Sequence, residues 1–71
     1  MSTKDELQQV EADLARLRAE IKDMRDQIGE VGATDQVEIS SMISQADEQE
    51  ELAAELERRR DVLRQRLEGE G

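Results

Sequence analysis

Carboxylates are the only side chains in this sequence that are numerous enough to suggest acid–base or metal chemistry. The 71 residues include 19 Asp and Glu, but no Cys and no His. Disulfides, thiolate or imidazole metal sites and triads built on Cys or His are therefore excluded. A general acid also needs a desolvated pocket that shifts its pKa, and among so many acids no pair stands out. We expect a non-enzymatic protein without a cofactor or a metal.

Gly29 and Gly32 are the other residues that could form a chemical motif. Their spacing is too short for a phosphate-binding loop, and the Lys and Ser/Thr of such a loop are missing from the required places. Charge and composition exclude further classes of function. The formal net charge is −9 and there is no Phe, Trp or Tyr, so the chain should be repelled by nucleic acids and anionic lipid and has no rings on which bases could stack.

Targeting signals are missing from the sequence as well. No apolar run approaches the ~20 residues that span a bilayer. The N-terminal segment MSTKDELQQV lacks the basic and then apolar layout of a signal peptide. These observations favour a cytoplasmic protein that contacts neither membrane nor nucleic acid directly.

The elements that position the acids are predicted to be helices. In the first half, apolar residues recur at alternating spacings of three and four, which is the heptad pattern of a coiled-coil seam. These residues are Leu7, Val10, Leu14, Leu17, Ile21, Met24, Ile28 and Val31. Thr3 followed by Glu6 fits a capping box, and Gly32 fits the position just past the helix end. We predict a helix over 4–31.

The second half repeats the spacing with weaker residues. Its seam includes Ile39, Met42, Ala46, Gln49, Ala53, Leu56, Arg60, Leu63 and Leu67. Asp35 followed by Glu38 fits a second capping box, which predicts a helix over 35–68. Every residue of the first seam finds a partner in the second if the chain folds back about residue 35.

The fold class that these patterns predict is all-α, an antiparallel two-helix coiled-coil hairpin. It would form one domain over residues 1–71, with a helix at 4–31, a turn at 32–34 and a helix at 35–68. One continuous helix is the alternative, and it would carry Gly29 and Gly32 in its interior at a cost of ~1 kcal/mol each.

Partners are suggested by the small and polar residues in the middle of the second seam. So small a domain with so thin a core is short of buried apolar area. Four more apolar residues could form a second stripe for a partner, or could merely flank the seam: Ile43, Leu52, Val62 and Leu67. We predict a protein partner or a homodimer that forms a four-helix bundle. The run ERRRD, residues 57–61, is interpreted as a solvated face with ion pairs such as Glu55 with Arg59.

The segment DQVEIS, residues 35–40, resembles the acidic D-x-x-D-x-A tip of the DksA/TraR family of RNA polymerase regulators. Asp35 matches the first acid, Glu38 replaces the second Asp and Ser40 replaces the Ala. The downstream EELAAELERRRDVLRQRLEGEG is similar to the family's second helix and its glycine exit. The family's zinc ribbon has no counterpart, because there are no cysteines.

The resemblance implies a hairpin that enters the secondary channel of RNA polymerase, with Asp35 and Glu38 near the catalytic magnesium. The alternative is that the two residues only form the helix cap and have no further role. Three functions therefore stay open: a coiled-coil interaction protein that self-associates or docks on a protein partner, a polymerase regulator acting through its acidic tip, and an acidic mimic of nucleic acid.

Overall fold

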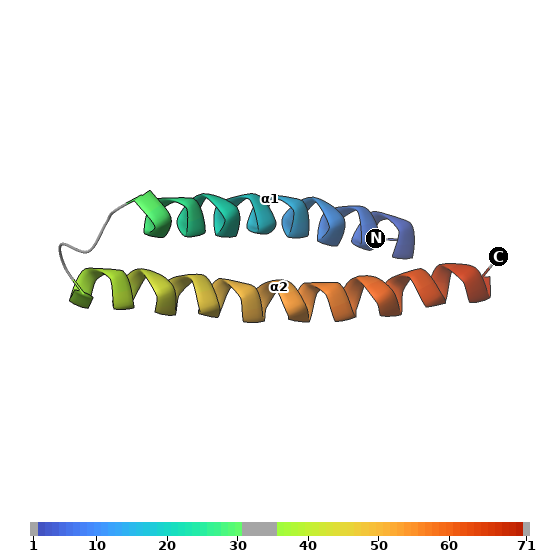
Figure 1. The fold of residues 1–71 in the computed structure, drawn as a ribbon. Helices are drawn as coiled ribbons and strands as arrows, with labels where there is room; N and C mark the ends of the chain where they lie inside the picture. The colour runs from blue at the N-terminus through green and yellow to red at the C-terminus, as the bar shows by residue number, and fades with distance from the viewer. Residues whose placement is uncertain (1, 31–35, 71) are drawn as a thin grey trace.

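A computed structural model describes residues 2–30 and 36–70 of the chain. Two α-helices account for nearly all of these residues: α1 (Thr3–Glu30) and α2 (Gln36–Glu70). The prediction of an all-α chain is confirmed. The helices lie side by side, and the two chain termini lie at the same end of the pair (Figure 1). The molecule is a rod with extents of 55 × 16 × 14 Å.

The first helix is capped by Ser2, not by Thr3 as the sequence pattern suggested. The Oγ of Ser2 accepts a hydrogen bond from the backbone N–H of Asp5 at 3.1 Å, and its carbonyl accepts one from the N–H of Glu6 at 3.0 Å. Thr3 is the first helical residue. Serine is the stronger N-cap of the two, because its unbranched side chain adopts the capping rotamer more freely. The helix therefore begins one residue earlier than predicted.

The other helix ends differ from the prediction by small amounts. Helix α2 reaches Glu70 instead of residue 68. Gly29 lies within α1 and is exposed. Three predicted features lie outside the described residues: the seam position Val31, the turn at 32–34 and Asp35, the first acid of the tip.

The core of the helix pair lies along the predicted seams. Seven apolar residues are buried: Val10, Leu14, Leu17, Ile21, Ala46, Ala53 and Leu63. The other described seam residues are half-buried: Leu7, Met24, Ile28, Ile39, Met42, Gln49, Leu56, Arg60 and Leu67. A repeat of 3.5 residues keeps one face of each helix turned toward its neighbour, which is why the spacing selects the buried face.

The two helices contribute unequally to this core. Helix α1 supplies four large side chains, whereas two of the three buried residues of α2 are alanines. The central cluster joins Leu14, Leu17 and Ile21 of α1 to Ala53 of α2, with Leu56 packed against them. Because alanine fills little space between the helices, the middle of the pair is thin.

Candidate interaction surface

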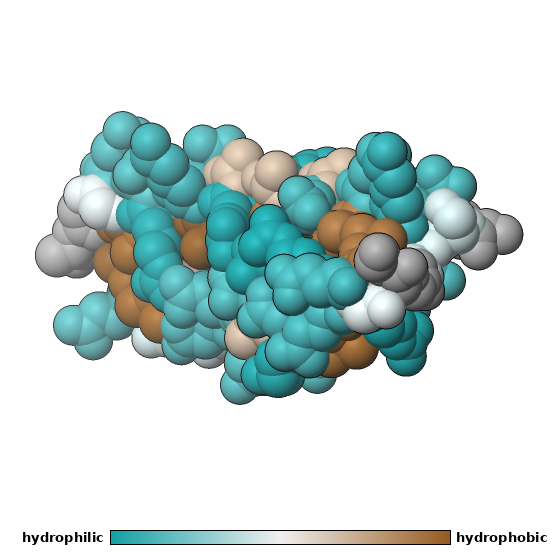
Figure 2. Space-filling model, turned by 90° about the vertical axis from the view of Figure 1, so that its right-hand side faces the viewer, coloured by the Kyte–Doolittle hydropathy of each residue, from teal (hydrophilic) through white to brown (hydrophobic). Residues whose placement is uncertain are grey.

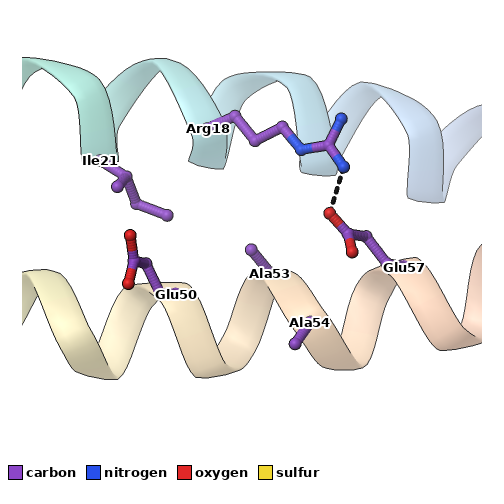
Figure 3. Close-up of a pocket in the computed structure, with 6 residues that line it drawn as sticks. All are labelled: Arg18, Ile21, Glu50, Ala53, Ala54 and Glu57. Carbon is purple, nitrogen blue, oxygen red and sulfur yellow. Dashed lines mark hydrogen bonds and ion pairs between the residues drawn. The ribbon is translucent and has the colours of Figure 1, made fainter.

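Ion pairs close one flank of the helix pair. In α1, Glu11, Arg18 and Arg25 follow one another at intervals of seven residues, and they pair with α2 residues at the same interval. Arg64 Nη2 lies 3.8 Å from Glu11 Oε1, and Arg25 Nη2 lies 2.7 Å from Glu50 Oε1. Arg18 pairs with Glu57 between them (Figure 3). We call these six residues the paired flank.

Arg25 is the most strongly engaged residue of the paired flank. Its Nε donates to Glu50 Oε1 at 3.0 Å, and its Nη2 also lies 3.4 Å from Asp47 Oδ1. The pKa of Arg25 is raised above its usual value, first by the hydrogen bond to Glu50, then by the attraction of that carboxylate and of Asp47. An arginine is protonated at every physiological pH in any case, so this pairing adds no pH dependence.

The paired flank contributes more to the alignment of the helices than to their stability. Its side chains are 41–53% exposed, and exposed ion pairs typically stabilise a fold by only ~0–1 kcal/mol each. Sliding one helix by a heptad would leave Glu11 or Arg25 without its partner. Charges at such positions beside a seam therefore select one register of the two helices.

A shallow hollow of about 240 Å³ lies between the ion pairs of this flank. Ile21 points toward α2, where Ala53 and Ala54 are too short to fill the space, while Glu50 and Glu57 border it (Figure 3). The hollow is open to solvent and has charged residues along its rim. Nothing in its shape resembles a buried acid–base site.

The opposite side of the helix pair carries a larger hollow, of about 520 Å³. Leu17, Leu52 and Leu56 form its apolar lining together with Gln49. The remaining lining residues are charged: Asp13, Arg16 and Glu20. We call these seven residues the Leu52 flank. Leu52 itself is 47% exposed, so this flank offers an apolar floor within a charged rim.

The four residues predicted as a partner surface do not form one stripe. Ile43 and Leu52 are nine residues apart on one continuous helix, which corresponds to about 900° of rotation and places them on opposite sides. Ile43 continues the row of Glu50 and Glu57 at an interval of seven, so it belongs to the side of the paired flank. The predicted surface is thereby split between two sides of α2.

Val62 and Leu67 also separate from each other. Val62, 49% exposed, is three residues from Arg59 and four from Arg66. Residues three and four apart are neighbours on a helix surface, so Val62 lies near the row formed by Leu52, Arg59 and Arg66. Leu67 is half-buried in the seam. Only Leu52 combines exposure with an apolar floor beside it.

Two arginines of the basic run of α2 form ion pairs, one with α1 and one within α2. Arg59 Nη2 lies 3.9 Å from Glu6 Oε2 of α1, in place of the expected partner Glu55. Arg60 keeps its side chain only 21% exposed and reaches Asp61 Oδ1 at 3.2 Å. The aliphatic stem of Arg60 thus lies in the seam while its guanidinium reaches the surface, as is common for long cationic side chains.

The predicted acidic tip is described only in part. Glu38 lies in the first turn of α2 and is exposed, while Asp35 lies outside the described residues. Among residues 2–30 and 36–70, no group of three or more acidic residues is arranged to hold a metal ion. In the same part of the chain, no helix is apolar over a length that could cross a membrane.

Sequence reasoning missed the paired flank. A signal was available, because three successive charged residues stand seven apart in each helix, each directly after a seam residue. Glu11, Arg18 and Arg25 in α1 are opposite in sign to Arg64, Glu57 and Glu50 in α2. Such complementary charges beside a seam are a known device for choosing partner and orientation.

Viewed from the end that carries the termini, the molecule is largely hydrophilic, with separate hydrophobic patches between the charged side chains (Figure 2). No protein-family model, curated protein or solved structure matches this chain. The surface therefore has to be interpreted from its own chemistry.

Proposed function

We propose that this chain is a non-enzymatic interaction protein, an antiparallel coiled-coil hairpin that binds a helical surface of another protein or of its own copies through the Leu52 flank. The observation that carries the proposal is the contrast between the two flanks. Ion pairs cover the seam on one side, whereas Leu52 stands exposed beside Leu17 and Leu56 on the other. A groove with an apolar floor and a charged rim is the form that helix-binding surfaces commonly take.

The thin core supports the same proposal. Alanines at two of the three buried positions of α2 leave little apolar area between the helices. A chain of this size gains stability when another helix covers the remaining apolar surface. Binding would then supply burial that the isolated helix pair lacks.

The resemblance to the DksA/TraR family supports an alternative, in which the chain regulates RNA polymerase from its secondary channel. The exposed position of Glu38 at the beginning of α2 is compatible with contact by a tip. A nucleic-acid mimic is less well supported, because the carboxylates of the paired flank are neutralised by arginines in place of forming a continuous acidic face.

Affinity capture from a lysate of the source organism, with identification of the bound proteins, tests the proposal. We expect the wild type to retain a defined protein partner and Leu52→Asp to lose it. Ile43→Asp is the matched control, since it adds the same charge at an exposed apolar site on the other side. Capture of RNA polymerase that depends on Asp35 and Glu38, and not on Leu52, would instead establish the alternative.

A further inference from the structure

We infer that the Leu52 flank binds a second copy of this chain, with α1 of each copy lying over α2 of the other and the termini of both copies at the same end. This inference rests on the proposed function and specifies its partner. The second copy would complete a four-helix bundle, in which the hollow beside Leu52 becomes an interior space.

Charge complementarity along the flank supports a second copy. Glu6, Asp13 and Arg16 follow one another on α1. Because Glu6 pairs with Arg59 and Arg18 pairs with Glu57, this stretch of α1 is level with the stretch of α2 that contains Glu55, Arg59 and Arg66. Followed from the end of the molecule that carries the termini, the charges of α1 are negative, negative and positive, and those of α2 are positive, positive and negative.

A two-fold axis parallel to the helices makes use of this order. Rotation about such an axis keeps every residue at the same position along the length of the rod, which is called its height here. The rotation lays α1 of one copy over α2 of the other. Glu6 would then face Arg66 of the second copy, Asp13 would face its Arg59 and Arg16 would face its Glu55. Symmetry repeats each contact, so six complementary charge contacts would surround the two Leu52 side chains. They would replace the Glu6–Arg59 and Asp13–Arg16 pairs that each separate copy forms within its own chain.

The apolar part of the flank fits the same arrangement. Leu52 lines the hollow together with Leu17 and Leu56, so it lies at the same height as the hollow. An axis that preserves height therefore places Leu52 of each copy over the hollow of the other. Half-buried Gln49 lies in the same lining and gives the interior one polar group, a common means of fixing the register in helical bundles.

The dimensions of the molecule allow a stable dimer. A face of 55 by 16 Å has a projected area of about 900 Å², similar to the ~800 Å² per partner in a standard interface. The accessible surface is 5335 Å², whereas a globular monomer of this mass would expose about 4500 Å². A second copy would cover the excess.

The opposite orientation, with the termini of the two copies at opposite ends, is disfavoured by charge. In that orientation α2 of one copy would lie antiparallel to α2 of the other, with the two Leu52 residues at the centre of the contact. Glu48 of one copy would then lie against Glu55 of the other. On α1 the same orientation would bring Asp13 toward Asp23. Like charges set directly opposite each other oppose association.

Charge exchange at Arg16 and Glu55 tests the arrangement. Both residues are exposed, so the fold of the helix pair should tolerate each change, and circular dichroism verifies this. We expect Arg16→Glu and Glu55→Arg each to raise the dimer Kd by about tenfold or more, and the double variant to restore it to near the wild-type value. Sedimentation equilibrium with interference optics measures Kd, because the chain has no Trp or Tyr.

Cysteine cross-linking tests the orientation, and the absence of native Cys makes each introduced thiol unique. A mixture of the single variants Asp13→Cys and Arg59→Cys should form the mixed disulfide, while a mixture of Gln45→Cys and Arg59→Cys should not. Efficient cross-linking of Gln45→Cys to Arg59→Cys would show the opposite orientation of the two copies and overturn the arrangement.

Two further outcomes separate this inference from the proposed function. A wild type that stays monomeric at about 50 µM, well above the Kd of a typical specific dimer, overturns the second copy as partner. If Leu52→Asp still abolishes capture of another protein in that case, the proposed function stands. If Leu52→Asp affects neither the dimer nor capture, both fail.

Discussion

The two helices follow the same spacing but fill it with different residues, and this difference explains the surface of the molecule. Helix α1 places Val10, Leu14, Leu17 and Ile21 in the core, so its seam is made of large side chains. Helix α2 places Ala46 and Ala53 there, beside half-buried Gln49. The residues of a seam can thus keep their spacing while their side chains fill less of the core.

The lost volume appears as hollows on both sides of α2. Ala53 and Ala54 border one hollow, and Gln49, Leu52 and Leu56 border the other. The first is crossed by ion pairs at its ends, whereas the second remains an open apolar groove. The short side chains of α2 therefore account for both the thin core and the hollows beside it.

The largest expected effect comes from truncating the strong seam. Leu14 is 2% exposed, and Leu14→Ala should lower the free energy of unfolding by about 2–5 kcal/mol, through lost burial and the cavity that remains. Leu52→Ala, at an exposed site of α2, should cost less than about 1 kcal/mol at concentrations where the chain is monomeric. Urea denaturation followed by circular dichroism measures both. Equal losses would mean that the two helices share the core evenly.

Strengthening the weak seam should reduce the difference between the helices. Gln49 is half-buried at a seam position, and Gln49→Leu replaces a polar group by an apolar one of similar size. We expect the free energy of unfolding to rise by about 1 kcal/mol, in proportion to the apolar area that becomes buried. Gln45→Leu, at an exposed position of the same helix, is the control and should change it little. A loss of stability in Gln49→Leu would show that the amide makes a needed interaction.

The end of α1 offers a smaller gain that does not involve the core. A Cβ added at Gly29 would meet no atom within 4 Å, and the residue is helical. Gly29→Ala should stabilise the fold by about 0.5–1 kcal/mol, because alanine loses less backbone freedom in a helix. Gly69→Ala is equally free of contacts and lies at the corresponding position of α2, one residue before its end, so a similar gain is expected. Thermal melts compare the two variants.

The smallest expected effect concerns the paired flank. A double-mutant cycle with Arg18→Ala and Glu57→Ala should give a coupling energy of about 0.2–1 kcal/mol, as expected for an exposed pair, and added salt should reduce it. The cycle for Arg16 and Glu57, which form no observed pair, is the control. A coupling above about 2 kcal/mol would mean that the flank stabilises the fold directly in addition to aligning the helices.

The spacing of the apolar residues is sufficient to predict the two helices and the face that each of them buries. A repeat near 3.5 residues turns the same side of each helix inward whatever the register, so Leu14, Leu17 and Ile21 could be assigned to the core before any contact was known. The residue types likewise exclude chemistry that needs a thiolate or an imidazole, because these 71 residues include no Cys and no His.

The residues beside the seam, by contrast, acquire their partners only when the two helices pack together. Long Arg side chains have several acids within reach in sequence, and only the alignment of two helices selects Glu6 over Glu55 as the partner of Arg59. Ile43 and Leu52 are likewise both apolar and exposed, but they lie on opposite sides of α2. Only the position of α1 places ion pairs along the side of Ile43 and an open hollow along the side of Leu52. Periodicity fixes a direction around a helix axis, whereas contacts depend on the height and rotation of the neighbouring helix, which no local pattern encodes.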